Sequence, residues 1–208
     1  MPQSDTPLIC LPYFSGSGHT AELARHIATG IAPADKTPAE KTPADKTQSN
    51  TVRSRLIDVT DLRNDDWQAL DAATLIAFGA PTYMGSTAAR FDIFLEEAAS
   101  RWPNLTWGDK LAAGFTVATH PSGDKLSALM RLSIYGAQMG MIWVGQTSIG
   151  APVFPDAPGL NRDGSWLGLM ATASRDKSEL ISPNDQTTAR HFGTRLAATA
   201  TRWQSGRP

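Results

Sequence analysis

A short turn near the amino end carries the residue types best suited to holding a small anion. Residues 15–20 read Ser-Gly-Ser-Gly-His-Thr and follow an apolar stretch. The glycines permit close approach of the backbone, and a helix beginning here would present free N–H groups at the positive end of its dipole. The hydroxyls of Ser15, Ser17 and Thr20 add hydrogen bonds. The turn lacks the lysine and the spacing of a P-loop, so it predicts a phosphate held by neutral donors.

Two later segments could hold a flat ring. Residues 81–86 read Pro-Thr-Tyr-Met-Gly-Ser and follow the apolar run 74–79. They can give backbone N–H groups to the edge of a ring and place Tyr83 or Met84 against its face. Residues 118–123 follow another apolar run and would lie on the other side of the ring, where His120 is a candidate proton donor. In an open α/β sheet, ligands bind at such carboxyl ends of strands, so the three segments together predict a flavin site.

Two other interpretations of the first turn stay open. Gly16, Gly18 and Ala21 also match G-x-G-x-x-A, the dinucleotide fingerprint, and Asp58 stands where a ribose-binding acid would lie. The three hydroxyls favour a terminal monophosphate instead, and the chain has no Tyr-x-x-x-Lys pair of a short-chain dehydrogenase. An ordinary glycine- and serine-rich turn between a strand and a helix is the remaining interpretation.

The elements that must position these turns alternate along the chain. Apolar runs predict strands at 8–13, 55–59, 74–79, 110–119 and 141–144, and helical periodicity predicts helices at 20–31, 66–72, from Ser86, through 126–135, and from Ser182. Ser86 and Ser182 are the expected N-caps. This alternation predicts an α/β fold, a flavodoxin-like three-layer sandwich with a five-stranded parallel sheet of order 2-1-3-4-5 and helices on both faces.

The 208 residues are expected to form a single flavodoxin-like domain, 1–208, with a low-complexity insertion at about 33–53. Tandem pentapeptides beginning at Pro33, Pro38 and Pro43 contain no large apolar residue to bury, so this insertion is expected to be mobile. Residues 146–182 are expected to be irregular, since glycine and proline are frequent between 150 and 168.

Bulk properties exclude several classes of protein. A formal net charge of −1 without a basic stripe argues against nucleic acid as a partner. The single cysteine, Cys10, is expected to be a buried small hydrophobe, and no metal site is expected. The sequence shows neither a signal segment nor an apolar run of membrane-spanning length, so no membrane association and a cytoplasmic location are expected.

The chain resembles the flavodoxin-like superfamily, and more closely the WrbA-type NAD(P)H:quinone oxidoreductases and the NADPH-dependent FMN reductases. Residues 13–20 and 78–85 carry the resemblance, with looser support from Gly140-Met141 and from residues 163–168. It implies non-covalent FMN as cofactor, NAD(P)H as electron donor, a quinone-like small-molecule acceptor and a homodimer or homotetramer. The implied cofactor-binding residues are Ser15, Gly16, Ser17, Gly18, His19, Thr20, Pro81, Thr82, Tyr83, Met84, Gly85, Thr119, His120, Ser122 and Gly123.

Trp102, Tyr83 and His120 are the expected substrate-pocket residues. Trp102, at a helix end, could stack a flat substrate over the ring, and the resemblance also implies a tryptophan beside the pocket at this position. The chain departs from the family pattern in its third loop, which holds His120, Pro121, Asp124 and Lys125, and at Gln138-Met139, where the family often has a histidine pair.

The leading expectation is an FMN-dependent oxidoreductase that passes two electrons from NAD(P)H to quinones. No side chain is expected to be catalytic, because the flavin would carry the chemistry. The alternatives are a flavodoxin-type electron carrier, which the near-neutral charge disfavours, and a flavodoxin-fold module that binds partners without a flavin.

Overall fold

The computed structural model describes residues 6–32, 52–174 and 179–206. The elements in chain order are β1 (Leu8–Tyr13), α1 (His19–Ile31), β2 (Arg53–Asp58), α2 (Asn64–Ala72), β3 (Leu75–Tyr83), β4 (Ser86–Thr87), α3 (Ala89–Ala98), η2 (Ala99–Arg101), β5 (Leu111–Ala118), α4 (Lys125–Gln138), β6 (Ile142–Trp143), β7 (Leu169–Thr172) and α5 (Pro183–Ser205). The predicted insertion at about 33–53 lies almost wholly outside the described residues, and at its carboxyl end Arg53 already belongs to β2.

The parallel sheet has the order β2-β1-β3-β5-β6, which confirms the predicted α/β fold and its strand order. The fifth position is shared by two strands. β6 pairs with Leu111 and Ala112 at the start of β5, and β7 pairs with residues 115–118 at its end. The expectation that 146–182 is irregular throughout is therefore wrong for β7, a four-residue strand.

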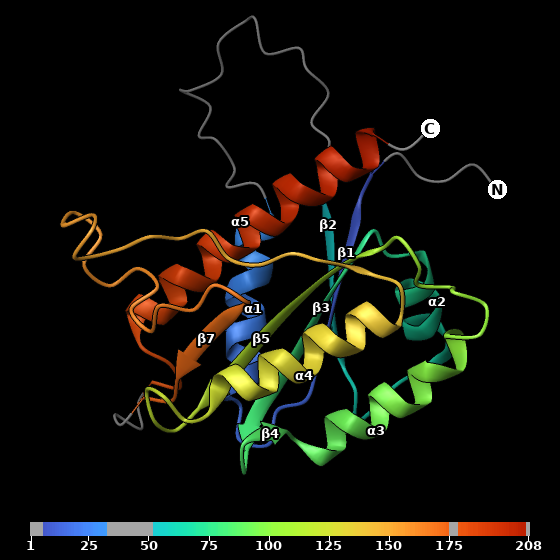
Figure 1. The fold of residues 1–208 in the computed structure, drawn as a ribbon, viewed down its shortest axis with the longest axis horizontal. Helices are drawn as coiled ribbons and strands as arrows, with labels where there is room; N and C mark the ends of the chain where they lie inside the picture. The colour runs from blue at the N-terminus through green and yellow to red at the C-terminus, as the bar shows by residue number, and fades with distance from the viewer. Residues whose placement is uncertain (1–5, 33–51, 175–178, 207–208) are drawn as a thin grey trace, which may run out of the picture.

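Helices cover both faces of the sheet (Figure 1). On one face α1 and α5 pack side by side, with Leu23, Ile27 and Phe192 fully buried. On the other face α2, α3 and α4 enclose a second core around Phe78 and Phe94.

The contact between α1 and α5 depends on two glycines. A Cβ atom at Gly30 would lie 2.0 Å from the carbonyl oxygen of Arg190, and one at Gly193 would lie 2.1 Å from that of Ile27. No side chain fits at these distances, so the two glycines allow the helix backbones to touch.

The segment between β3 and α3 differs from the sequence prediction. β3 continues through Tyr83, and Ser86 belongs to β4, which pairs with it antiparallel. Met84 and Gly85 form the two-residue turn with φ of 49° and 81°, the positive values that a type I′ hairpin requires. Ser86 is therefore not the N-cap: Ala88 holds that position, and α3 begins at Ala89.

Candidate functional site

The three predicted segments meet at the carboxyl ends of β1, β3 and β5. Between them lies a cavity of about 140 Å³, which we call the cradle. Its lining consists of Ser15, Gly16, Ser17, His19, Thr20, Pro81, Thr82, Tyr83, Val117, Ala118, Thr119 and Ala173. β1 pairs with β2 on one side and with β3 on the other, so the chain order reverses at β1, the kind of position where open α/β sheets bind ligands.

The first turn leads directly into α1. Gly18 is the N-cap residue with φ of 89°, and its position carries no side-chain cap. The backbone N–H of Ala21 donates to the Ser15 hydroxyl at 3.2 Å, and that of Glu22 donates to the Gly18 carbonyl at 2.9 Å. Because the N–H groups of a first helical turn have no intrahelical acceptor, those of His19 and Thr20 are available to a ligand.

Thr20 is the most enclosed of the polar cradle residues. Only 1% of its surface is exposed, and the residue lines the cradle. A hydroxyl can donate a hydrogen bond to a phosphate oxygen, which makes this one a candidate ligand contact.

Tyr83 closes the first turn from the side of β3. Its hydroxyl lies so close to Gly16 that a Cβ at that glycine would be 2.6 Å from it. Below Tyr83, the hydroxyls of Thr82 and Thr116 share a buried hydrogen bond of 2.7 Å, which joins β3 to β5 beneath the cradle. Tyr83 itself is half exposed, so its ring is accessible to a ligand.

Several predicted cofactor contacts lie outside the cradle lining. They are Gly18, Met84, Gly85, His120, Ser122 and Gly123. Met84 is fully exposed at the hairpin tip, and the Gly85 carbonyl accepts a hydrogen bond from the Ser127 hydroxyl of α4.

The third loop contributes Thr119 to the cradle, while His120 is exposed beyond it. Gly123 has φ of 52°, and a Cβ there would lie 2.6 Å from that of Ala118, so the loop turns back tightly on β5. Sequence reasoning missed Val117 and Ala173, and it included Ala118 only as the start of the third segment. Val117 and Ala118 end β5, and Ala173 follows β7, the strand that the sequence did not reveal.

Trp102 does not border the cradle. It follows η2 at the end of α3 that points away from β4, and a ten-residue helix spans about 15 Å. Within one copy of the chain, Trp102 is therefore not part of the cradle lining, and its role beside a substrate stays a prediction.

The cradle is neutral and polar. None of the described residues that line it is acidic, which suits an anionic ligand. Asp58, the candidate ribose contact, instead accepts hydrogen bonds from the backbone and hydroxyl of Thr60 at 3.0 and 2.8 Å. Nearby, burial raises the pKa of the Tyr13 phenol, and the negative charge of Asp58 adds to the effect, so this group stays neutral at neutral pH.

The described residues contain no group of three or more histidine, cysteine or acidic side chains able to hold a metal ion. In the same part of the chain, no helix combines the length and apolarity needed to cross a membrane.

The strand order and the cradle at the switch point define a flavodoxin-like α/β protein. No protein-family model matches the chain. Flavodoxin FldP of Pseudomonas aeruginosa is 30% identical over 193 residues, which cover 89% of this chain and 92% of that protein. The chain therefore belongs to the flavodoxin family.

Other similarities extend over the same length. The NAD(P)H dehydrogenase (quinone) of Caulobacter vibrioides is 27% identical over 197 residues, covering 90% of this chain and 94% of that protein. The crystal structure of a flavodoxin, WrbA-like protein from Agrobacterium tumefaciens matches with a TM-score of 0.68 and 29% identity, covering 95% of this chain and 99% of that one. An archaeal flavodoxin, 19% identical with a TM-score of 0.58, shares the fold.

Proposed function

We propose that the chain binds FMN non-covalently in the cradle and transfers two electrons from NAD(P)H to quinones or similar flat acceptors. The observation that carries the proposal is the cradle itself, in which the hydroxyl-bearing residues Ser15, Ser17 and Thr20 line a cavity at the start of α1. Thr20 lies in the first turn of α1, where backbone N–H groups favour a phosphate. The relatives named NAD(P)H dehydrogenase (quinone) support the choice of donor and acceptor.

The residues present fit this cofactor. A phosphate dianion would be held by the hydroxyls of Ser15, Ser17 and Thr20 and by the N–H groups that begin α1, with no acidic lining residue to repel it. Ser15 already accepts from Ala21, which leaves its own hydrogen free to donate. The ring would lie at the mouth of the cradle, between Tyr83 and the loop that follows Thr119.

When bound, FMN supplies the two-electron chemistry of the balanced reaction, in which NAD(P)H, a proton and a quinone give NAD(P)⁺ and a hydroquinone. The chain itself would bind and orient the cofactor: the start of α1 would hold the phosphate, Tyr83 would limit the position of the ring, and the β3–β4 hairpin and the loop after β5 would offer backbone N–H groups to the ring. No side chain has to act as nucleophile or acid. Removal of FMN is therefore expected to abolish activity, while single substitutions cause graded losses.

The test is reconstitution of the purified protein with FMN, followed by NADH and NADPH oxidation with and without benzoquinone. We expect bound flavin and quinone-dependent oxidation. A protein that does not retain FMN at micromolar concentrations would contradict the proposal.

A second function is favoured by one comparison. The relative that reaches 30% identity is named a flavodoxin, so an electron carrier without substrate turnover is the alternative. The same experiment separates the two: a carrier would bind FMN but would not oxidise NAD(P)H when benzoquinone is added.

A further inference from the structure

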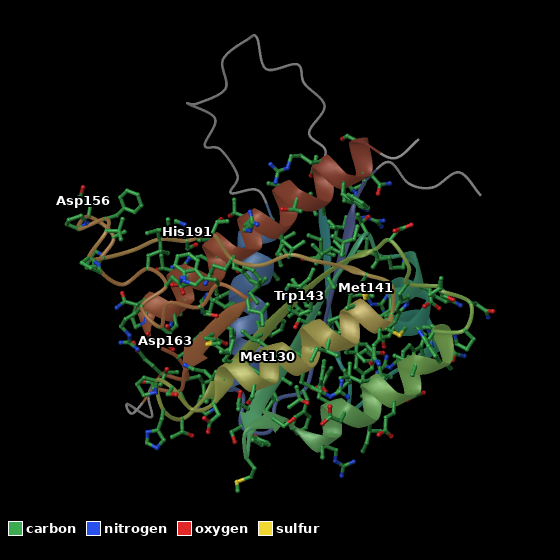
Figure 2. All side chains as sticks on the ribbon, in the orientation of Figure 1. Met130, Met141, Trp143, Asp156, Asp163 and His191 are labelled. Atoms are coloured by element: carbon green, nitrogen blue, oxygen red, sulfur yellow. The ribbon has the colours of Figure 1, made fainter. Side chains whose placement is uncertain are left out.

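Beside the cradle lies a much larger groove. It has a volume of about 1190 Å³ and runs between the first half of α4 and residues 162–167. We call it the α4 groove, and its apolar wall is formed by Leu126, Met130, Trp166, Leu167 and Met170. Figure 2 labels Met130 on α4 and Asp163 on the neighbouring loop.

The α4 groove and the cradle have common boundaries. In the β3–β4 hairpin, Tyr83 lines the cradle and Gly85, two residues later, lines the groove. In the loop after β5, Thr119 lines the cradle and Pro121 lines the groove. The cradle and the groove are therefore adjacent, and both border the β3–β4 hairpin and the loop after β5.

The wall of the groove presents apolar side chains to solvent. Leu126 is 54% exposed, Met130 48% and Trp166 53%. Such a concentration of exposed apolar side chains around a cavity marks a binding surface. The chain thus offers a path of hydrocarbon contacts that begins next to the proposed ring position.

The charges of the groove balance. Lys125 is fully buried and forms an ion pair with Asp163, whose side chain is 6% exposed, so both are neutralised at the floor. One exposed acid, Asp124, and one half-exposed base, Arg162, remain among its lining residues. A hydrocarbon chain needs no charged partner, so these few charges are compatible with an apolar occupant.

Size also favours an extended occupant. Pockets of about 300–1000 Å³ hold whole drug-sized ligands, so a bare quinone ring would leave most of this groove empty. We propose that the α4 groove holds the hydrocarbon tail of a quinone whose ring lies at the cradle, which makes tailed, lipophilic quinones the substrate class. The inference rests on the proposed function.

The test compares two quinones with the same ring, one without a tail and one with a decyl tail. Their dissociation constants are measured with the oxidised, FMN-loaded protein by quenching of tryptophan fluorescence, without NAD(P)H. We expect the tailed quinone to bind at least tenfold more tightly, because burial of each methylene in the groove is favourable. The same preference is expected in kcat/KM when NAD(P)H is present.

The variants Leu126→Gln and Met130→Gln are expected to reduce this preference at least threefold each. Both side chains are exposed, so the substitutions leave the core intact. Ile134→Gln is the matched control: Ile134 is 56% exposed on the same helix but lies outside the groove lining, and its variant should keep the full preference.

The outcomes separate the two proposals. Turnover with equal affinity for both quinones would overturn the tail site and leave the proposed function intact. A tail preference in binding without NAD(P)H oxidation would support the tail site and contradict the oxidoreductase. Equal losses in Ile134→Gln and Met130→Gln, with a dimer that dissociates in light scattering, would identify the exposed side of α4 as a contact between copies and overturn the inference.

Discussion

At the scale of single residues, Thr20 combines almost complete burial with a place in the lining of the cradle. It lies in the first turn of α1, where its hydroxyl could donate a hydrogen bond to a bound phosphate. The Thr20 hydroxyl should therefore contribute to the affinity for the ligand rather than to the stability of the free protein.

Thr20→Val removes this hydroxyl and keeps the shape of the side chain. We expect affinity for FMN to fall about tenfold to a hundredfold, since a hydrogen bond to a charged group contributes about 1.5–3 kcal/mol. Titration of the flavin-free protein with FMN, followed by flavin fluorescence, measures the change. Thr29→Val on the same helix is the control, because its exposed hydroxyl bonds to the Arg25 carbonyl. Equal affinities of the two variants would contradict the role of Thr20.

The buried thiol of Cys10 predicts how the stability of the protein changes in alkaline solution. Burial is the main cause that raises the pKa of its thiol to about 12, against about 8.5 for an unfolded thiol. A raised pKa means that the contribution to stability is complete below about 8.5 and is lost as pH rises towards 12. Between pH 8.5 and 10 the free energy of unfolding of the wild type should fall by about 2 kcal/mol more than that of Cys10→Ala. Urea unfolding at each pH can measure this difference. Parallel curves for the two proteins would exclude the thiol as the cause.

Most of the cradle could be predicted at this scale, because Ser15, Ser17, Thr20 and Thr119 are hydroxyls at strand ends. Ala173 could not, since nothing distinguishes a small apolar residue within a segment expected to be irregular. Trp102 was expected near the ring from its place at a helix end and from the resemblance, and the length of α3 separates it from the cradle of its own chain.

At the scale of elements, the start of α4 depends on a buried ion pair. Lys125 stands in the first turn, where the positive end of the helix dipole disfavours a cation, and Asp124 provides no side-chain cap. The Lys125 ammonium donates to Asp163, to the Ala171 carbonyl and to the Thr172 hydroxyl. This one side chain therefore connects α4 to β7 and to the preceding loop.

Lys125→Met should destabilise the protein by about 3–5 kcal/mol, because the buried Asp163 carboxylate then loses its buried cation and keeps only the half-exposed Arg162 at 3.8 Å. The double variant Lys125→Met/Asp163→Leu should lose less stability than the single variant, since both charges are then removed. Urea unfolding measures both losses. Arg63→Met, which breaks an exposed pair with Asp61, is the control and should change stability by no more than about 0.5 kcal/mol.

The element boundaries show where sequence patterns succeed and fail. The runs that form β1, β3 and β5 were predictable, because strands covered on both faces are continuously apolar. The hairpin at Met84 and Gly85 was not, since Met-Gly lacks the Asn or Asp that usually announces a type I′ turn. By residue type Ser86 predicts a helix cap, but its backbone pairs with Tyr83 in the hairpin.

At the scale of the whole molecule, binding and folding are linked. A ligand that binds only the folded state at one hundred times its dissociation constant stabilises a protein by about 2.7 kcal/mol. For a chain of this size, FMN should raise the melting temperature by about 5–10 °C. Riboflavin, which lacks the phosphate, should raise it much less at equal concentration. Equal shifts in calorimetry would show that the turn at 15–20 does not hold a phosphate.

The sharing of one sheet position by β6 and β7 has a consequence for the continuity of the chain. β6 pairs with β5 up to Ala112, and β7 pairs with the same strand from Phe115 onward. The segment between β6 and β7 therefore begins and ends at neighbouring points of β5. It is organised locally, because the Asn161 side chain bonds to Gln146, Ser148 and Ser165. A break within residues 153–157 would interrupt no strand pairing. Two separately produced fragments, 1–154 and 155–208, are therefore expected to reassociate into the complete sheet.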